Sequence, residues 1–272
     1  MSKKILLVSG DSWGDPNWTS IQHPEIDCGW PKWPELLAEK LDMDCVNLCK
    51  SGSGNERIYS TLLDKLTDEW YMKDVGLVLP AWSTAPRRDY QIGSPPWWTN
   101  DMMDFRGCIE YWIDRSLRYF YSFQNVCENL NVPFRQFQML NLYTGWIYEQ
   151  RENLKGHKKD DMYQHLLEHI QKSPYYKKIN PYYFLGWPTE RSVLPGERQG
   201  LSGHGSAAGH FTSFGGDIER ISERDKHPNE KGQEQLAHHL FQEIKWSSYP
   251  VHGDGYKGEE ADLILHLQRD KI

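Results

Sequence analysis

The chain has no long hydrophobic run and no excess of positive charge. Its apolar stretches fall far short of the roughly 20 residues that cross a bilayer, so we expect no membrane insertion. The net charge of −7 argues against a surface that binds nucleic acid. Residues 1–10 lack the apolar core of a signal peptide, which leads us to expect synthesis in the cytoplasm without a signal peptide.

Cysteine is also scarce, and its spacing fits neither a disulfide framework nor a metal site. The five cysteines are scattered and odd in number: Cys28, Cys45, Cys49, Cys108 and Cys127. This usage indicates reduced packing residues in a reducing compartment. His204 and His210, in the small-residue loop 200–216, have no carboxylate or cysteine at ligand spacing, so no metal is predicted there.

Tryptophan, by contrast, is plentiful. Many of the 12 tryptophans lie in polar, proline-rich stretches such as 29–34 and 94–98. Aromatic side chains in such loops can line a groove for carbohydrate or another apolar ligand, or form a protein interface. They can equally serve as anchors that let a long loop pack, and the sequence leaves these interpretations open.

The order of the N-terminal elements predicts an α/β fold with a parallel sheet. Short apolar runs at 4–9, 45–48 and 75–80 read as buried strands, and helical spacing occupies 33–41 and 56–66 between them. Such a strand–helix alternation is typical of parallel sheets with right-handed crossovers.

Later segments extend the same pattern. We expect a loop over 85–100, a long amphipathic helix over 102–130 with its aromatic residues in the core, and a strand over 134–142. Helices are predicted near 160–171 and over 228–245, and 175–188 reads as an aromatic insertion. The chain thus divides into one α/β domain over 1–245, with insertions at 85–130 and 143–216, and a C-terminal tail over 246–272.

Three strand ends converge in such a sheet. Parallel strands bring their carboxyl ends to one edge, which places Ser12, Gly52 and Ser83 near one another. Ser12 follows the first strand, where it could be a nucleophile or simply the cap of the next helix.

A nucleophilic serine needs a base and an oxyanion site. His227 is the best-placed base of the eleven histidines, because it precedes the last helix with Asp225 beside it to orient it. The N–H groups of Ser12 and Gly52 are natural donors to an oxyanion.

These blocks resemble those of the SGNH/GDSL hydrolases. The resemblance rests on Gly10-Asp11-Ser12 after the first strand, the Gly52 turn after the second, and residues 225–229 before the last helix. It implies a three-layer, flavodoxin-like α/β/α sandwich and hydrolysis of an ester, often O-acetyl on a carbohydrate, without metal or organic cofactor. Ser12 would attack, His227 would act as base and then acid, and Asp225 would orient His227.

Two positions depart from the family pattern. Arg224 stands three residues before His227, where the family has its aspartate, so Asp225 is only two residues before. Residues 81–83 (Ala-Trp-Ser) replace the Gly-x-Asn pattern that supplies a third oxyanion donor, a role that would pass to Asn55 or Ser83. Residues beside these turns are expected to contact substrate: Asp11, Trp13, Trp82 and Arg87.

Two functions from different classes follow. The first is a serine esterase that removes acyl groups from a glycan or a similar surface polymer. The second is a catalytically weak or inactive protein of the same fold, such as a phage tail or capsid component, which would form homo-oligomers or contact virion proteins through its aromatic loops and tail. A dinucleotide-binding protein is disfavoured, because residues 51–54 lack the third glycine of that motif.

Overall fold

A five-stranded parallel sheet forms the centre of the molecule. The computed structural model describes residues 3–68, 72–93, 97–101, 108–140, 142–143, 157–180, 183–185 and 218–247. The sheet order is β2-β1-β3-β6-β7, with β1 (Ile5–Ser9), β2 (Asp44–Asn47), β3 (Val75–Trp82), β6 (Gln136–Gln138) and β7 (Phe184–Leu185). This is the flavodoxin-like order, and it confirms the predicted parallel α/β fold.

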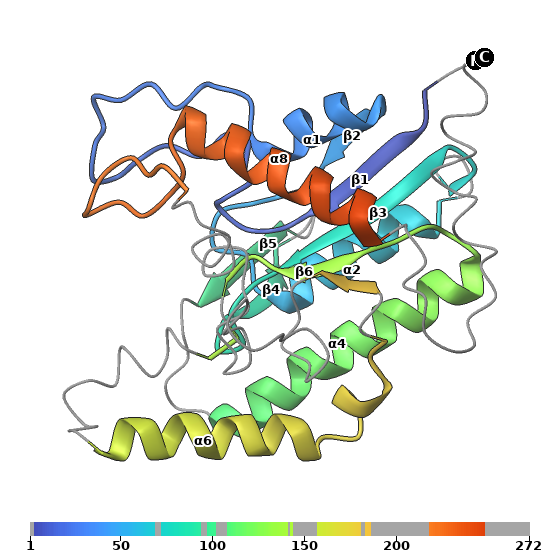
Figure 1. The fold of residues 1–272 in the computed structure, drawn as a ribbon, viewed down its shortest axis with the longest axis vertical. Coiled ribbons are helices and arrows are strands. Elements are labelled where there is room, and N and C mark those ends of the chain that lie inside the picture. Colours follow the sequence, from blue (N-terminus) through green and yellow to red (C-terminus); the bar gives the residue numbers. More distant parts are fainter. Residues whose placement is uncertain are drawn as a thin grey trace.

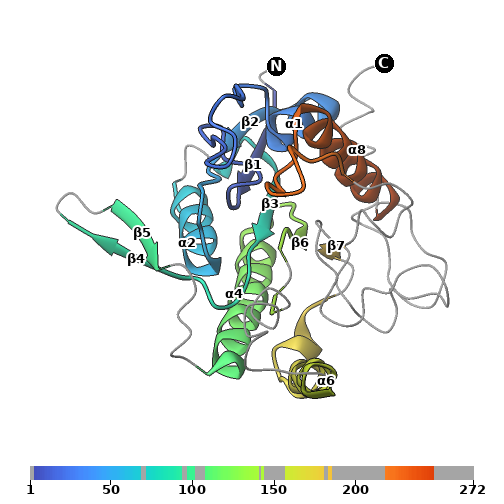
Figure 2. The ribbon, with the colours of Figure 1, turned by 90° about the vertical axis from the view of Figure 1, so that its left-hand side faces the viewer.

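Helices cover both faces of the sheet. On one face lie α1 (Trp33–Leu41) and α8 (Glu230–Ser247), which pack against each other (Figure 1). On the other lie α2 (Asn55–Leu66) and α4 (Ile109–Leu130), as Figure 2 shows. The helix α6 (His157–Lys172) and the short 3₁₀ helix Tyr176–Lys178 pack outside α4. The result is the expected three-layer arrangement.

Successive side chains of β1 point to opposite faces of the sheet, so they belong to two different cores. Leu7 joins α2 and α4 on one face, whereas Leu6 and Val8 join α1 and α8 on the other. All three leucine and valine side chains are fully buried, as expected for a strand covered on both faces. Two cores back to back hold the carboxyl ends of β1 and β3 in fixed positions.

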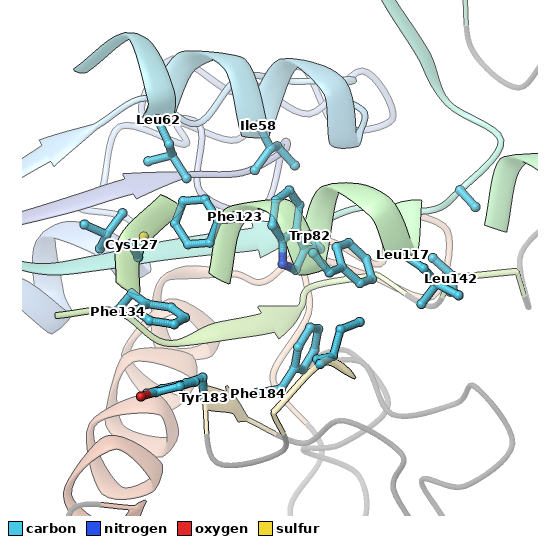
Figure 3. Close-up of a cluster of buried hydrophobic side chains, with 14 of the residues drawn as sticks. Ile58, Leu62, Trp82, Leu117, Phe123, Cys127, Phe134, Leu142, Tyr183 and Phe184 are labelled. Carbon is cyan, nitrogen blue, oxygen red and sulfur yellow. The ribbon is translucent and has the colours of Figure 1, made fainter. Parts of the chain in front are cut away.

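Trp82, at the end of β3, is the centre of the core on the α4 face. Its ring lies 4.8 Å from that of Phe120 and 5.8 Å from that of Phe123. Figure 3 shows the same ring next to Ile58 of α2 and Phe123 of α4. The indole N–H donates to Gln136 Oε1 at 3.1 Å, so its one polar group is satisfied.

Apart from the start of α4, the predicted helices agree with the observed ones to within about three residues at each end. The loop expected over 85–100 is wrong, because β4 (Arg88–Ile92) and β5 (Trp97–Asp101) form an antiparallel hairpin there. Asp89 anchors this hairpin to α2 by accepting bonds from the Gly54 and Arg57 amides. That anchor joins residues distant in sequence, and a periodicity argument cannot detect it.

Two further differences concern the other half of the sheet. The helix α4 begins at Ile109 rather than at residue 102, and it forms the crossover between β3 and β6. The strand expected over 134–142 is regular only at Gln136–Gln138, and its partner β7 lies within the range predicted as an insertion. The loop 200–216, with His204 and His210, and the tail beyond residue 247 lie outside the described residues. None of the described helices is long and apolar enough to cross a membrane.

Candidate active site

Ser12 lies in the tight turn that leaves β1. Asp11 shapes this turn twice: its carbonyl accepts the Gly14 N–H at 3.2 Å, and its Oδ1 accepts the Trp13 N–H at 3.1 Å. Ser12 is held between these bonds at the carboxyl edge of the sheet and is partly exposed. It does not cap a helix, because the next helix, α1, begins at Trp33.

His227 lies in the turn just before α8. Its backbone carbonyl accepts the Ile221 N–H at 3.0 Å, which closes the segment 221–227 into a loop. Asn229 then begins the helix, because its side-chain oxygen accepts the Gly232 N–H at 2.8 Å. Figure 1 shows this segment next to the loop that follows β1.

Ser12, His227 and Asp225 form a continuous hydrogen-bonded chain. His227 Nε2 lies 2.8 Å from Ser12 Oγ, and His227 Nδ1 lies 2.7 Å from Asp225 Oδ1. The same Oδ1 accepts the His227 backbone N–H at 3.1 Å. An aspartate two residues before the histidine therefore reaches the ring, despite the shorter spacing.

Asp225 carries its negative charge in a largely enclosed place, with its side chain 5% exposed. Burial acts to raise the pKa of this carboxyl, but hydrogen bonds from Ser20 and His227 outweigh it and hold the pKa below its usual value. Asp225 is thus ionised at neutral pH, where it favours the His227 tautomer with the proton on Nδ1. Nε2 is then free to accept a proton from Ser12.

The two backbone amides predicted as oxyanion donors, those of Ser12 and Gly52, remain available. Within the described residues, the N–H groups of Ser12 and Gly52 have no hydrogen-bond partner. Gly52 has φ 79°, a left-handed conformation that a residue with a Cβ rarely adopts. The turn is held by Asp15, whose Oδ2 accepts the N–H and the hydroxyl of Ser51 at 2.7 and 2.8 Å.

The side chains proposed to replace the third oxyanion donor are fully used elsewhere. Asn55 donates its Nδ2 hydrogens to Ser83 O and Ser116 Oγ, both at 3.0 Å, and accepts the Ser83 N–H at 2.7 Å. The hydroxyl of Ser83 bonds to Asp11 and Arg87. Both Asn55 and Ser83 are 0% exposed, so the prediction that either donates to an oxyanion is wrong.

Two of the four predicted substrate contacts are wrong. Trp82 cannot contact a substrate, because its ring is buried in the core described above. Asp11 is wrong as well: its side chain is 0% exposed and forms an ion pair with Arg87 at 3.2 Å. Arg87 is 15% exposed, and its Nη1 bonds to Asp11, Ser53 and Ser83, so it ties three turns together. Trp13 lines a cavity.

That cavity, of about 320 Å³, adjoins His227, and its lining joins the two loops of the site. Its walls are Trp13, Trp18, Ile21, Gln22 and residues 224–227. The Trp18 ring stacks on the His227 ring with centroids 4.2 Å apart and planes 29° apart. Ile21, which lines the same cavity, is 92% exposed.

Sequence reasoning missed several residues of this site. Trp18, Ser20 and Ile21 lie in a long polar loop in which no periodicity or motif distinguishes them. Their roles depend on contacts with residues about 200 positions away, such as the bond between Ser20 and Asp225. Among the described residues, no group of three or more His, Cys, Asp or Glu side chains is placed to hold a metal ion.

Comparison with known proteins finds similarity only at the level of structure. Neither a protein-family model nor a curated protein matches the sequence. Similar solved structures include a protein from Desulfitobacterium hafniense described as lipolytic and of the G-D-S-L family, at 11% identity and TM-score 0.41 over 88% of this chain and 99% of that one. Another is LAE5, an α/β hydrolase from the metagenome of Lake Arreo, at 11% identity and TM-score 0.45 over 90% and 96%.

A third is a catalytic mutant of an acetylxylan esterase from Geobacillus stearothermophilus, at 13% identity and TM-score 0.39 over 89% and 94%. These likenesses concern the fold.

Proposed function

We propose that the chain is a serine hydrolase that cleaves carboxylic esters. The observation that carries this proposal is the chain of two short hydrogen bonds, 2.8 Å from Ser12 to His227 and 2.7 Å from His227 to Asp225. A serine becomes a strong nucleophile when a histidine removes its proton and a carboxylate stabilises the resulting imidazolium. The free N–H groups of Ser12 and Gly52 complete the set with two donors for an oxyanion.

The reaction proceeds in two halves. Ser12 Oγ attacks the ester carbonyl carbon while its proton moves to His227 Nε2, and the carbonyl oxygen becomes an oxyanion that accepts the two amide hydrogens. The intermediate collapses with cleavage of the ester C–O bond, and the leaving alcohol takes the proton from His227. Water, deprotonated by His227, then attacks the acyl-enzyme and releases the carboxylic acid and Ser12.

The cavity beside His227 supports an acylated carbohydrate or a small ester as substrate. Trp18 and Ile21 give it an apolar wall next to the base, and a flat indole face can stack on a sugar ring. We choose acetyl as the acyl group to test first, because the resemblance to the SGNH/GDSL hydrolases implies O-acetyl esters of carbohydrates.

The test is the release of acid from esters by the purified chain. We expect turnover of 4-nitrophenyl acetate and release of acetate from an acetylated oligosaccharide, both lost in Ser12→Ala. The Ser12→Ala protein must keep the wild-type melting temperature, because Ser12 is partly exposed and outside the core. Turnover that persists in Ser12→Ala would place the chemistry elsewhere.

One observation favours the second candidate, a weak or inactive binding protein of this fold. The polar side chains nearest the third strand end, Asn55 and Ser83, are closed to substrate. Loss of one oxyanion donor typically slows catalysis by about 10²- to 10³-fold. Measured rates only slightly above background, with normal binding of the acetylated oligosaccharide, would support this candidate; association with a virion remains a prediction.

A further inference from the structure

Ser20 contacts the one oxygen of the Asp225 carboxylate that His227 does not use. Its hydroxyl donates to Asp225 Oδ2 at 2.5 Å, and both residues are buried. The two residues are 205 positions apart in the chain. This bond therefore exists only because the loop after β1 folds against the turn before α8.

The hydrogen bonds of the Ser20 hydroxyl make it a donor to Asp225 alone. A serine hydroxyl has one hydrogen to donate, and at Ser20 it goes to Asp225. Its oxygen in turn accepts the backbone N–H of His23 at 3.0 Å, which fixes the side-chain direction. Ser20 is thus a donor held in place by its own loop.

A second contact joins the same two segments. His23 Nε2 lies 2.7 Å from Ser222 Oγ, and this oxygen also accepts the backbone N–H groups of Arg224 and Asp225 at 3.1 and 3.0 Å. The backbone of Asp225 and its carboxylate are therefore both attached to the segment 20–23.

The short spacing of this chain makes such support necessary. Asp225 Oδ1 takes both His227 contacts, from the backbone N–H and from Nδ1. With Oδ2 unbonded, the carboxylate could rotate about its Cβ–Cγ bond, a torsion with a broad energy profile. The bond from Ser20 stops that rotation and keeps Oδ1 directed at the ring.

We propose that Ser20 is a positioning residue of the active site, which acts on His227 through Asp225. This rests on the proposed hydrolase function. It makes the hydrogen-bonded chain four residues long: Ser12, His227, Asp225 and Ser20. The loop after the nucleophile thereby also orients the general base.

The decisive experiment compares two variants of equal volume, Ser20→Thr and Ser20→Val. Threonine keeps the hydroxyl and valine lacks it. We expect Ser20→Thr to keep kcat for 4-nitrophenyl acetate within about threefold of wild type, and Ser20→Val to lower kcat by about tenfold or more with little change in KM. Thr19→Ala, an exposed neighbour, is the matched control and should leave both constants unchanged.

A double-mutant cycle tests whether Ser20 acts through Asp225. In an Asp225→Asn background, Ser20→Val should cause no further loss of kcat. An equal tenfold loss in both backgrounds would overturn the proposal, as would equal kcat values for Ser20→Thr and Ser20→Val. Melting temperatures identify any variant that fails to fold, and Ser20→Ala, which adds no volume, then takes the place of Ser20→Val.

A spectroscopic readout separates this proposal from the proposed function. The proton between His227 Nδ1 and Asp225 should give a low-field proton NMR signal that disappears in Asp225→Asn. Loss of the Ser20 hydroxyl should shift or broaden this signal even if the wild-type protein hydrolyses no ester. A signal that is unchanged in Ser20→Ala would contradict the positioning role, whatever the esterase assays show.

Discussion

Two polar clusters lie at the same edge of the sheet and differ in one respect. The first, Ser12 with His227, Asp225 and the Gly52 amide, has donors and acceptors left for a substrate. In the second, Asp11, Asn55 and Ser83 are fully buried, and Arg87, at 15% side-chain exposure, bonds to two of them. We call the first the open cluster and the second the closed cluster.

The difference shows that a polar residue at a strand end is not thereby a functional residue. Parallel topology brings both clusters to one edge, as expected for this fold. The two clusters differ in their hydrogen bonds. The buried polar groups of the closed cluster bond to one another, because buried polar groups in proteins generally need a partner. Changes in the open cluster should therefore reduce activity, and changes in the closed cluster should reduce stability.

The largest effect should come from Ser12→Ala. Without the nucleophile, we expect kcat for 4-nitrophenyl acetate to fall by roughly 10⁵-fold or more, since members of such a chain act as a unit. The free energy of unfolding, measured with urea, should stay within about 0.5 kcal/mol of wild type. A large loss of stability would mean that the open cluster is structural.

Asp225→Asn should come next. The amide can donate to His227 Nδ1 and so favour the wrong tautomer, which removes the acceptor at Nε2. We expect kcat to fall by about 10³- to 10⁴-fold while KM is retained. Glu223→Gln, two residues earlier and 99% exposed, provides a control that also removes one carboxylate and should leave kcat unchanged.

Arg87→Gln should break the closed cluster. The side chain of Asp11 would remain buried without its cation, and loss of one partner of a buried pair costs about 3–5 kcal/mol, here reduced because Arg87 is 15% exposed. Urea unfolding should therefore show a loss of about 3 kcal/mol. The kcat of the folded fraction should change by less than about tenfold; a loss like that of Asp225→Asn would place Arg87 in the reaction.

Trp18→Leu should weaken substrate binding. The indole forms one wall of the cavity and stacks on His227, and an aromatic contact contributes about 0.5–1.5 kcal/mol. We expect KM for an acetylated oligosaccharide to rise about two- to tenfold, with a smaller change in kcat. An unchanged KM would show that sugar does not stack on this wall.

The smallest effect should appear in acid. Burial acts to raise the pKa of Asp15, but hydrogen bonds from Ser51 and Asn17 hold it below the usual 3.8. Ionised Asp15 therefore stabilises the fold fully above the pKa of the unfolded state, and this stabilisation is lost as pH falls below about 3.8 through the lower folded value. Melting temperatures should decline less steeply below pH 4 in Asp15→Asn than in wild type.

Much of the fold could be predicted because it depends on local pattern. The apolar runs of β1 and β3 and the helical spacing of α1, α2 and α8 specify buried faces wherever they occur. The β4–β5 hairpin could not be predicted in this way, because its strands are short and are attached to α2 through Asp89.

The same distinction between local pattern and tertiary contact applies to the residues of the site. Ser12, Gly52 and His227 could be found because each follows a strand or precedes a helix, so topology alone places them. Asn55, Ser83 and Asp11 occupy equally favourable positions, and only their complete set of internal hydrogen bonds excludes them. Ser20 and Trp18 were missed because their partners are brought near by tertiary folding rather than by sequence.

If His227 and Asp225 activate Ser12, the wild-type protein should react with a fluorophosphonate. Mass spectrometry of the labelled peptide should then show a single adduct on Ser12, formed at least about 100 times more slowly in His227→Gln. No adduct in the wild-type protein, or an adduct on another serine, would contradict this activation.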